Sequence, residues 1–318
     1  HMMSALSSMV DWAGADWDGA ASTARQTIAD QTDGRAVAMA DTTLGFVAMG
    51  RGDLSEAERE LTIALDAGEA SGWLEMILPP LWGLAETAVL GGDPVRAIGL
   101  VRDAFERARA VHEVALLAPF VVTGVRAYQA AGQPSDAEAW FAECEVDLAS
   151  LSTVTEPALH HGRGLVALAA GSTGIARQEL DAAVRGWDAC GRVWEATWAR
   201  LDLANCLSRM NRFAEAVDAA ADARAMAARL GSEPLAERAE MILRMARGHV
   251  ASDEPWRPLT AREFAVARLI TDGLTNAEIA AELGIAPKTA SSHVEHILAK
   301  LGASRRAEIA AWASRVEP

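Results

Sequence analysis

The stretch TNAEIAAELGIAPKTASSHVEHILAKLG, residues 275–302, predicts two short helices joined by a tight turn. Thr275 is followed three residues later by Glu278, the capping-box pattern that begins a helix. Gly284 is expected to end that helix, and Pro287 suits the first position of the next one, where a missing backbone N–H costs little. The stretch therefore predicts a helix-turn-helix, a motif whose second helix enters the major groove of DNA.

Two more helices are expected to flank this pair and to complete a small domain over residues 259–318. The first is predicted to begin at Thr260, with Glu263 again three residues on, and to end at Gly273. The last is predicted over residues 305–313, where apolar residues again recur at helical spacing. Four short helices with these start and stop signals indicate an all-α domain.

The second helix of the pair carries a polar face opposite its apolar stripe. This face contains Lys288, Ser291, Ser292 and Glu295. Serine hydroxyls can bond to any base, and a glutamate can accept a hydrogen bond from cytosine. Lys288 lies near the helix N-terminus, where the helix dipole already favours phosphate. The residue types on this face are therefore those of a DNA-reading helix.

Charge is unevenly distributed along the 318 residues. The net charge of −15 argues against nonspecific nucleic-acid binding by the whole surface. From Trp256 onward there are eight Lys or Arg and seven Asp or Glu, a net charge of +1, which leaves −16 on the preceding part. Both lysines of the chain, Lys288 and Lys300, lie in the C-terminal part. That part is the one suited to an anionic partner.

A repeat of about forty residues precedes this domain. Five segments share a turn signal and then an alanine in the first turns of a helical stretch, with steps of 40, 40, 39 and 40 residues. A weaker copy contains Ala20. A fixed period of this size indicates stacked helix pairs, each unable to bury its apolar face alone. Strand signals are nearly absent, so the predicted class is all-α. The repeat alanines are Ala57, Ala97, Ala137, Ala176 and Ala216.

Together these patterns predict a helical solenoid over residues 3–248 and the helix-turn-helix domain over residues 259–318. Residues 249–258 are expected to form a linker, because they contain Pro255 and Pro258 together with Ser, Asp and Glu.

The solenoid resembles the tetratricopeptide repeat, with a period longer than the usual 34 residues. The stretch SGWLEMILPPLWGLAETAVLGGD, residues 71–93, is most similar to the sensor repeats of large ATP-binding LuxR-type regulators, the family that includes the maltose-system activator. The stretch LTAREFAVARLITDGLTNAEIAAELGIAPKTASSHVEHILAKLGASRRAEIA, residues 259–310, closely resembles the LuxR-type DNA-binding domain. This second resemblance implies base contacts by Ser291, Ser292 and Glu295. It implies phosphate contacts by Lys288, Thr289, Lys300 and Arg306.

The sequence departs from the family pattern at positions that bear on affinity. Ala286 stands where a capping serine is usual, which should cost the helix about 1 kcal/mol. Glu295 places a negative charge on the reading face, so modest binding by one copy is expected. The resemblance implies a homodimer on double-stranded DNA, with two copies on the half-sites of an inverted repeat.

Clustered aromatic residues are the main indication of a ligand site on the repeats. Trp187, Trp194 and Trp198 lie within twelve residues, with Arg192 among them. One interpretation is a pocket for a small-molecule effector or a protein partner. The alternative, core packing between repeats, is the commoner use of such residues.

Several functions are excluded by the absence of their motifs. No phosphate-binding loop, nucleophile elbow, zinc-protease motif or glycine-rich dinucleotide loop occurs, so neither an enzyme nor a bound cofactor is predicted. His293 and His296 lack the further ligands that a metal site needs. The large regulators carry an ATP-binding domain upstream of their repeats. This chain is expected to be either a piece of such a protein or a short regulator without that switch, and the helical start near the N-terminus favours the former.

The predicted function is sequence-specific transcriptional regulation, with the solenoid receiving a signal and the C-terminal domain binding DNA. The alternative is a protein-interaction scaffold in which the helix-turn-helix serves dimerisation or is held away from DNA. No apolar run reaches the roughly 20 residues that a membrane span needs, and no signal peptide is present, so no membrane partner and a cytoplasmic location are expected.

Overall fold

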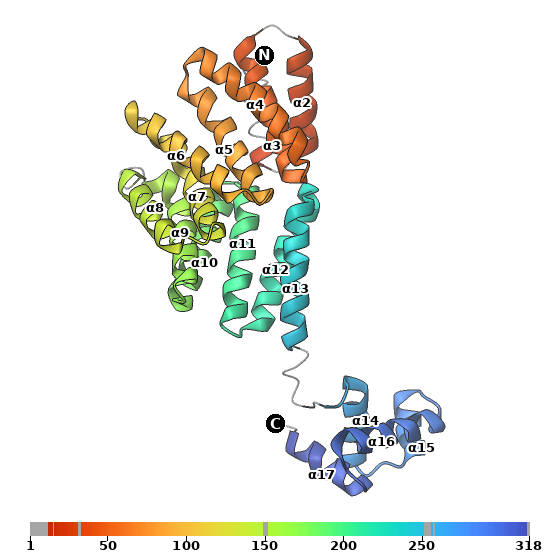
Figure 1. The fold of residues 1–318 in the computed structure, drawn as a ribbon. Coiled ribbons are helices and arrows are strands. Elements are labelled where there is room, and N and C mark those ends of the chain that lie inside the picture. The colour runs from red at the N-terminus through yellow and green to blue at the C-terminus, as the bar shows by residue number, and fades with distance from the viewer. Residues whose placement is uncertain are drawn as a thin grey trace. The chain divides into compact units, whose positions relative to one another are not determined.

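The computed structural model describes residues 12–14, 16–30, 33–148, 152–250, 256 and 258–316, and every regular element in them is a helix. The chain divides into two compact units, His1–Arg247 and Gly248–Pro318. Figure 1 shows the helices of each unit. The predicted all-α class, with a helical solenoid followed by a four-helix domain, is confirmed. No helix in the described part is both long and apolar enough to cross a membrane.

The helices of the first unit alternate between two layers of the solenoid. The inner helices are α3 (Gly34–Arg51), α5 (Leu74–Leu90), α7 (Ala118–Ala130), α9 (Ser152–Ala169), α11 (Val193–Arg209) and α13 (Glu233–Val250). The outer helices are α2 (Trp17–Asp30), α4 (Leu54–Ser71), α6 (Pro94–Ala110), α8 (Pro134–Leu148), α10 (Thr173–Ala189) and α12 (Phe213–Leu230), and a short 3-10 turn, η1 (Ala115–Leu117), precedes α7.

Each repeat is a helix pair whose second helix begins at the predicted place. The five repeat alanines are at most 1% exposed, because each lies in the first turns of an outer helix and faces the inner one. The turns before them follow the expected chemistry. Gly52 adopts a left-handed conformation with φ 93°, and the Asp53 side chain accepts a hydrogen bond from the Glu56 backbone N–H to cap α4.

Glycines in the inner helices accommodate large side chains of the outer helices. Gly45 faces Leu61, and Gly164 faces Leu180 in the same way. At Gly124 of α7 the indole of Trp140 lies against the glycine backbone. Trp140 is fully buried, and its Nε1–H donates to Val121 O at 3.2 Å. A side chain at these glycines would occupy the space that the outer-helix residue fills.

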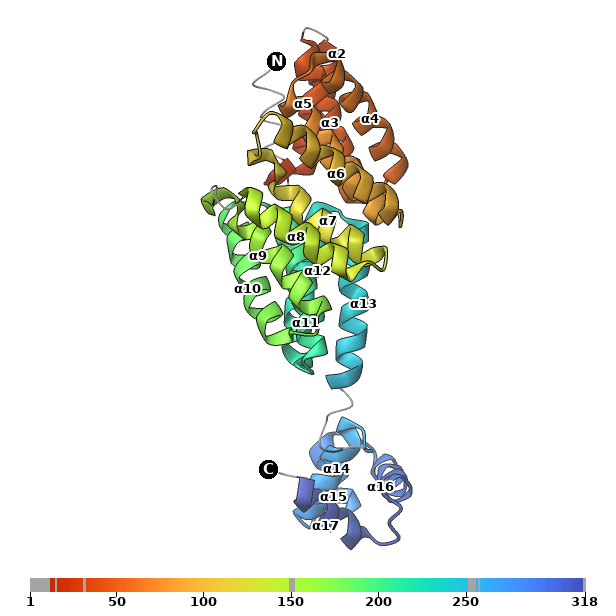
Figure 2. The same cartoon turned by 60° about the vertical axis from the view of Figure 1, so that its left-hand side comes forward.

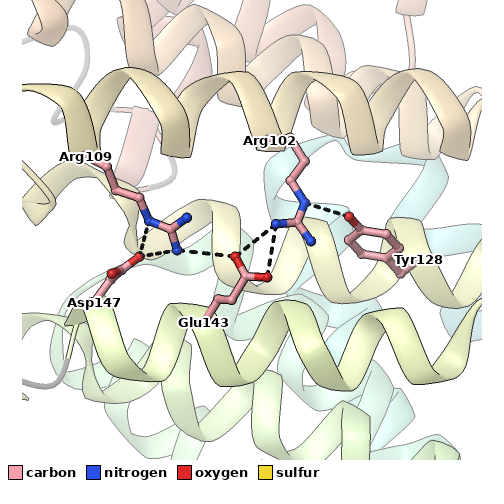
Figure 3. A network of polar contacts seen from close by, with 5 residues as sticks. All are labelled: Arg102, Arg109, Tyr128, Glu143 and Asp147. Atoms are coloured by element: carbon pink, nitrogen blue, oxygen red, sulfur yellow. Dashed lines mark hydrogen bonds and ion pairs between the residues drawn. The ribbon is translucent and has the colours of Figure 1, made fainter.

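Neighbouring repeats are also joined by polar contacts between residues about one repeat apart. Figure 3 shows Arg102 and Arg109 of α6 above Glu143 and Asp147 of α8. Arg102 donates to Glu143 Oε2 at 2.9 Å and, through Nε, to Tyr128 Oη at 2.8 Å. Arg109 donates to Asp147 Oδ2 at 2.7 Å, 38 residues further on. These partly exposed pairs stabilise the stack only modestly, but they fix its register.

The superhelix brings helices from distant repeats into contact. The rings of Trp17 in α2 and Trp194 in α11 are 6.1 Å apart. Arg126 of α7 forms an ion pair with Asp202 of α11, 76 residues later. The start of α13 lies beside the turn between α3 and α4, an arrangement visible in Figures 1 and 2. The inner helices therefore surround a shared interior.

The C-terminal unit is a separate bundle with its own core. Its helices are α14 (Ala261–Thr271), α15 (Asn276–Leu283), α16 (Pro287–Leu301) and α17 (Arg306–Val316). Val266, Ile279, Ala290, Ile297 and Ile309 are fully buried between them. α13 extends to Val250, so residues 249 and 250 of the predicted linker are helical. Residues 251–255 and 257 lie outside the described residues, and the linker over 249–258 stays a prediction.

Candidate nucleic-acid interface

The turn between α15 and α16 contains the capping, glycine and proline residues from which it was predicted. Thr275 and Glu278 form a complete capping box, with Thr275 N–H donating to Glu278 Oε2 at 2.7 Å. Gly284 ends α15 in a left-handed conformation, with φ 63°. Pro287 is the first residue of α16, and Ala286 precedes it without any side-chain cap.

α16 presents an exposed polar face at its N-terminal half. Lys288, Thr289, Ser292 and Glu295 are all exposed, and within residues 258–316 none of their four side chains has a hydrogen bond or an ion pair. Because side chains three and four residues apart lie on the same side of a helix, these side chains share one face of α16. The face offers an ammonium and a hydroxyl as donors and a carboxylate as an acceptor.

Ser291 lies at the border of this face and is bonded within the domain. Its hydroxyl donates to Pro287 O at 3.2 Å and accepts from Asn276 Nδ2 at 3.1 Å. Asn276 Oδ1 accepts in turn from Arg306 at 2.7 Å, and Arg306 also donates to Leu274 O. This chain of contacts ties α15, α16 and α17 together. Ser291 and Arg306 are thus engaged in holding the reading helix.

Lys300 has a similar internal partner. Its Nζ lies 2.6 Å from Glu263 Oε2, and the Glu263 carboxylate also accepts from the backbone N–H of Thr260 at 2.8 Å. Glu263 is buried in spite of its charge. Burial raises the pKa of Glu263, but the hydrogen bonds from Lys300 and Thr260 outweigh burial and leave that pKa below its ordinary value. Lys300 therefore anchors the end of α16 to the start of α14.

The four residues predicted to form one pocket on the repeats do not do so. Trp187 and Trp194 are buried in the core, as the packing interpretation expects. Trp198 is also buried but lines a cavity of about 470 Å³ inside the solenoid. Arg192 lines a different cavity, of about 350 Å³, whose walls are mostly apolar and include Trp82. The cluster in sequence is split because successive helix positions face different sides.

A buried polar cluster joins three inner helices beside Trp198. Asp202 accepts from Arg126 and from His161 Nε2, the latter at 2.8 Å. Trp187 Nε1–H donates to His161 Nδ1 at 3.2 Å, so the proton of the neutral imidazole resides on Nε2. Burial lowers the pKa of His161. Burial raises the pKa of Asp202, but the charge of Arg126 and the bond from His161 hold it below its usual value.

Sequence reasoning overlooked this cluster, although the repeat contained a signal for it. Arg126, His161 and Asp202 stand 11 to 15 residues before their repeat alanines, each within an inner helix. A charged residue at that register indicates the inner surface of the solenoid.

Comparison with known proteins assigns a class to the C-terminal unit. Residues 257–313 match the model of the bacterial regulatory proteins of the luxR family. The geometry of α15 and α16 agrees with that match. Residues 257–313 therefore form a helix-turn-helix domain of the luxR family.

The curated relatives share this domain. The DNA-binding transcriptional activator DevR/DosR of Mycobacterium tuberculosis is 34% identical over 79 residues, which is 25% of this chain and 36% of that protein. The transcriptional regulatory protein UhpA of Salmonella typhimurium is 49% identical over 53 residues, 17% of this chain and 27% of the relative. A protein of Mycobacterium bovis named as an HTH-type transcriptional regulator is 37% identical over 79 residues, 24% of this chain but only 9% of its own length.

The solenoid is similar in fold to a solved structure of a Rap protein, which is not among the regulators named above. A Rap protein crystallised in complex with competence and sporulation factor superposes with a TM-score of 0.51, covering 78% of this chain and 75% of that one. The sequence identity is 14%, so the likeness concerns the fold alone.

Proposed function

We propose that this protein is a cytoplasmic, sequence-specific DNA-binding transcriptional regulator whose solenoid receives a signal and controls the C-terminal domain. The observation that carries the proposal is the free polar face of α16, held in place by the contacts of Asn276, Arg306 and Lys300. The match of residues 257–313 to the luxR family supports it.

In the proposed complex, the N-terminal half of α16 lies in the major groove. Ser292 and Glu295 meet base edges, and Ser291 does so from the border of the face. Lys288 and Thr289 contact phosphate beside the helix N-terminus. Two copies bind as a homodimer on an inverted repeat, because one short helix with a negative Glu295 supplies little affinity by itself.

Lys300 and Arg306 remain in the proposed set of phosphate-contacting residues, but both already have partners within the domain. Both retain their charge, but the Lys300 ammonium lies against Glu263 and the Arg306 guanidinium against Asn276. Substituting either one is expected to act first through the stability of the domain. Lys288 is therefore the cleaner probe of phosphate contact.

Lys288→Ala is expected to weaken binding of the full chain to every duplex and to lower the slope of log K against log salt by about one. The reason is that one fewer phosphate-neutralising cation releases one fewer counterion. The measurement is fluorescence anisotropy with a random-sequence duplex over a series of salt concentrations.

Arg315→Ala is the matched control, because Arg315 is an exposed cation of α17 outside the reading helix. Its salt slope should equal that of the unchanged chain. An unchanged slope in Lys288→Ala would contradict the placement of α16 on DNA.

For the solenoid, we propose a small-molecule or protein signal. The fold likeness to a Rap protein solved with a bound factor supports reception of a protein partner. The second candidate is a scaffold function, in which the repeats bind a partner and the helix-turn-helix serves dimerisation. The fold likeness to a Rap protein supports this candidate as well. Partner binding by a chain that shows no preference among duplex sequences would favour it.

A further inference from the structure

The interior of the solenoid contains a basic cavity that the DNA-binding proposal does not use. Its volume is about 470 Å³, within the range of small-molecule sites. Residues from α5, α7, α9, α11 and α13 line it, so nearly all of the wall comes from inner helices. We call it the interior cavity, and its polar wall consists chiefly of Arg126, Trp198, Asp202, Asn205, Arg209 and Arg238.

Two guanidinium groups flank the indole of Trp198 in this wall. Arg126 Cζ lies 3.8 Å from the ring centroid and Arg238 Cζ lies 4.8 Å from it. Each contact is favourable as a cation–π interaction, but the two cations are brought close together. Burial and then the charge of Arg126 lower the pKa of Arg238. Without a ligand, the positive charges of Arg126 and Arg238 therefore repel each other beside the Trp198 ring.

The charges of the wall are not balanced. Asp202 compensates Arg126, with which it forms an ion pair. Among the described residues, Arg209 donates only to a backbone carbonyl, Leu168 O, at 2.7 Å. Arg238 forms no direct ion pair with any described residue, although the charges of Asp202 and Glu86 act on it. The cavity wall therefore carries excess positive charge on the exposed side chains of Arg209 and Arg238, in a solenoid whose sequence is strongly acidic.

The cavity wall is rich in hydrogen-bond donors. The exposed side chain of Asn205 projects from α11 and has no hydrogen bond to any described residue. Guanidinium groups are donors only, so a ligand that bonds to the exposed Arg209 and Arg238 side chains must supply acceptors.

We propose that the interior cavity binds a small organic oxyanion, held by the guanidiniums of Arg238 and Arg209. A carboxylate or phosphate matches the fork of a guanidinium and accepts two hydrogen bonds from it. Leu165, Leu168 and Val89 form apolar parts of the same wall, which suits an organic body on the ligand. This inference rests on the proposed function in one respect, namely that the solenoid receives the signal.

The binding test uses the full chain and four probes at constant ionic strength: citrate, inorganic phosphate, trialanine with a free carboxylate and trialanine amide. Calorimetric titration and the fluorescence of tryptophan report binding. At least one oxyanion probe is expected to bind saturably, and Arg238→Gln is expected to weaken it about tenfold, as the loss of one charge-assisted contact predicts. Arg238 makes no hydrogen bond to the described protein, so the variant should keep its fold.

Arg224→Gln is the control, because Arg224 lies on outer helix α12 and pairs with Glu240 at 3.1 Å. It should bind the probe as the unchanged chain does. Binding of free trialanine but not of its amide assigns the oxyanion to a peptide C-terminus. Binding of citrate or phosphate instead assigns it to a free small anion. Absence of saturable binding by every probe, or equal binding by the unchanged chain and Arg238→Gln, overturns the proposal.

Affinity for a random-sequence duplex, measured on the same samples, separates this inference from the DNA-binding proposal. DNA binding without any probe binding would reject the interior cavity and leave the regulator proposal standing. Probe binding by a chain that never binds DNA would support the interior cavity and reject the regulator proposal. Variants that fail to fold are recognised by circular dichroism, and Asn205→Ala then provides a second test at an exposed position of the same wall.

Discussion

Gly124→Ala is expected to lower the free energy of unfolding of the solenoid by about 2–4 kcal/mol. A Cβ built on Gly124 would lie 2.8 Å from Trp140 Cζ2 and closer still to Nε1 and Cε2. The indole cannot move away, because it is fully buried, bonded to Val121 O and packed 4.5 Å from Phe105. In an exposed helix the same substitution would stabilise by up to about 1 kcal/mol.

Gly99→Ala supplies the matched control. Gly99 lies inside α6, is exposed, and has no atom within 4 Å of a built Cβ. Urea denaturation followed by circular dichroism should show Gly124→Ala well below the unchanged chain and Gly99→Ala level with it or above. Equal midpoints for the two variants would mean that the inner helix and Trp140 are not in the contact described here.

Glu263→Ala is expected to destabilise the C-terminal domain by about 1.5–3 kcal/mol, the usual value of hydrogen bonds to a charged group, because Glu263 is buried while its partner Lys300 is 39% exposed. The substitution removes half of the α14 capping box and leaves Lys300 without its carboxylate. Hydrogen exchange measured by mass spectrometry on peptides from 258–316 would localise the loss to this domain. DNA affinity should fall with it, because α16 loses its anchor to α14.

Glu278→Ala is the control, since Glu278 makes the same capping box in α15 but is exposed and forms no ion pair with any residue of 258–316. A much smaller change in exchange is expected there. If the two glutamates behaved alike, the Lys300 contact would contribute nothing.

The same carboxylate predicts a dependence on pH. Its pKa in the folded domain lies below the ordinary value of 4.5, so the folded state releases the proton more readily than the unfolded state. The stability that Glu263 contributes is therefore fully present above pH 4.5 and is lost as the pH falls from 4.5 through the folded pKa. In Glu263→Ala this part of the acid sensitivity should disappear.

Much of the fold follows from local sequence signals. The repeat alanines indicated where each outer helix begins, because only a small side chain fits where two helix backbones approach. The capping boxes of Thr260 and Thr275 located α14 and α15 for a similarly local reason. These features depend on residues within a few positions of one another, so a single sequence contains them.

The remaining features depend on the superhelical arrangement of the repeats. A small rotation per repeat decides whether α2 meets α11, and no local pattern measures that rotation. The pairing of Arg126 with Asp202 and the split of the tryptophan cluster both follow from it. Likewise, the sequence placed Lys300 and Arg306 among cations for phosphate, but only the packed domain reveals that Glu263 and Asn276 already engage them.

The most direct test of the central claim, that the exposed face of α16 reads base sequence, is selection from a random duplex library at near-physiological salt. The full chain and its Ser292→Ala and Glu295→Ala variants would be compared. The account predicts an enriched inverted repeat for the full chain, with preference relaxed or altered at one or two positions of each half-site in the variants. An identical enriched sequence for all three proteins, or no enrichment by any of them, would contradict it.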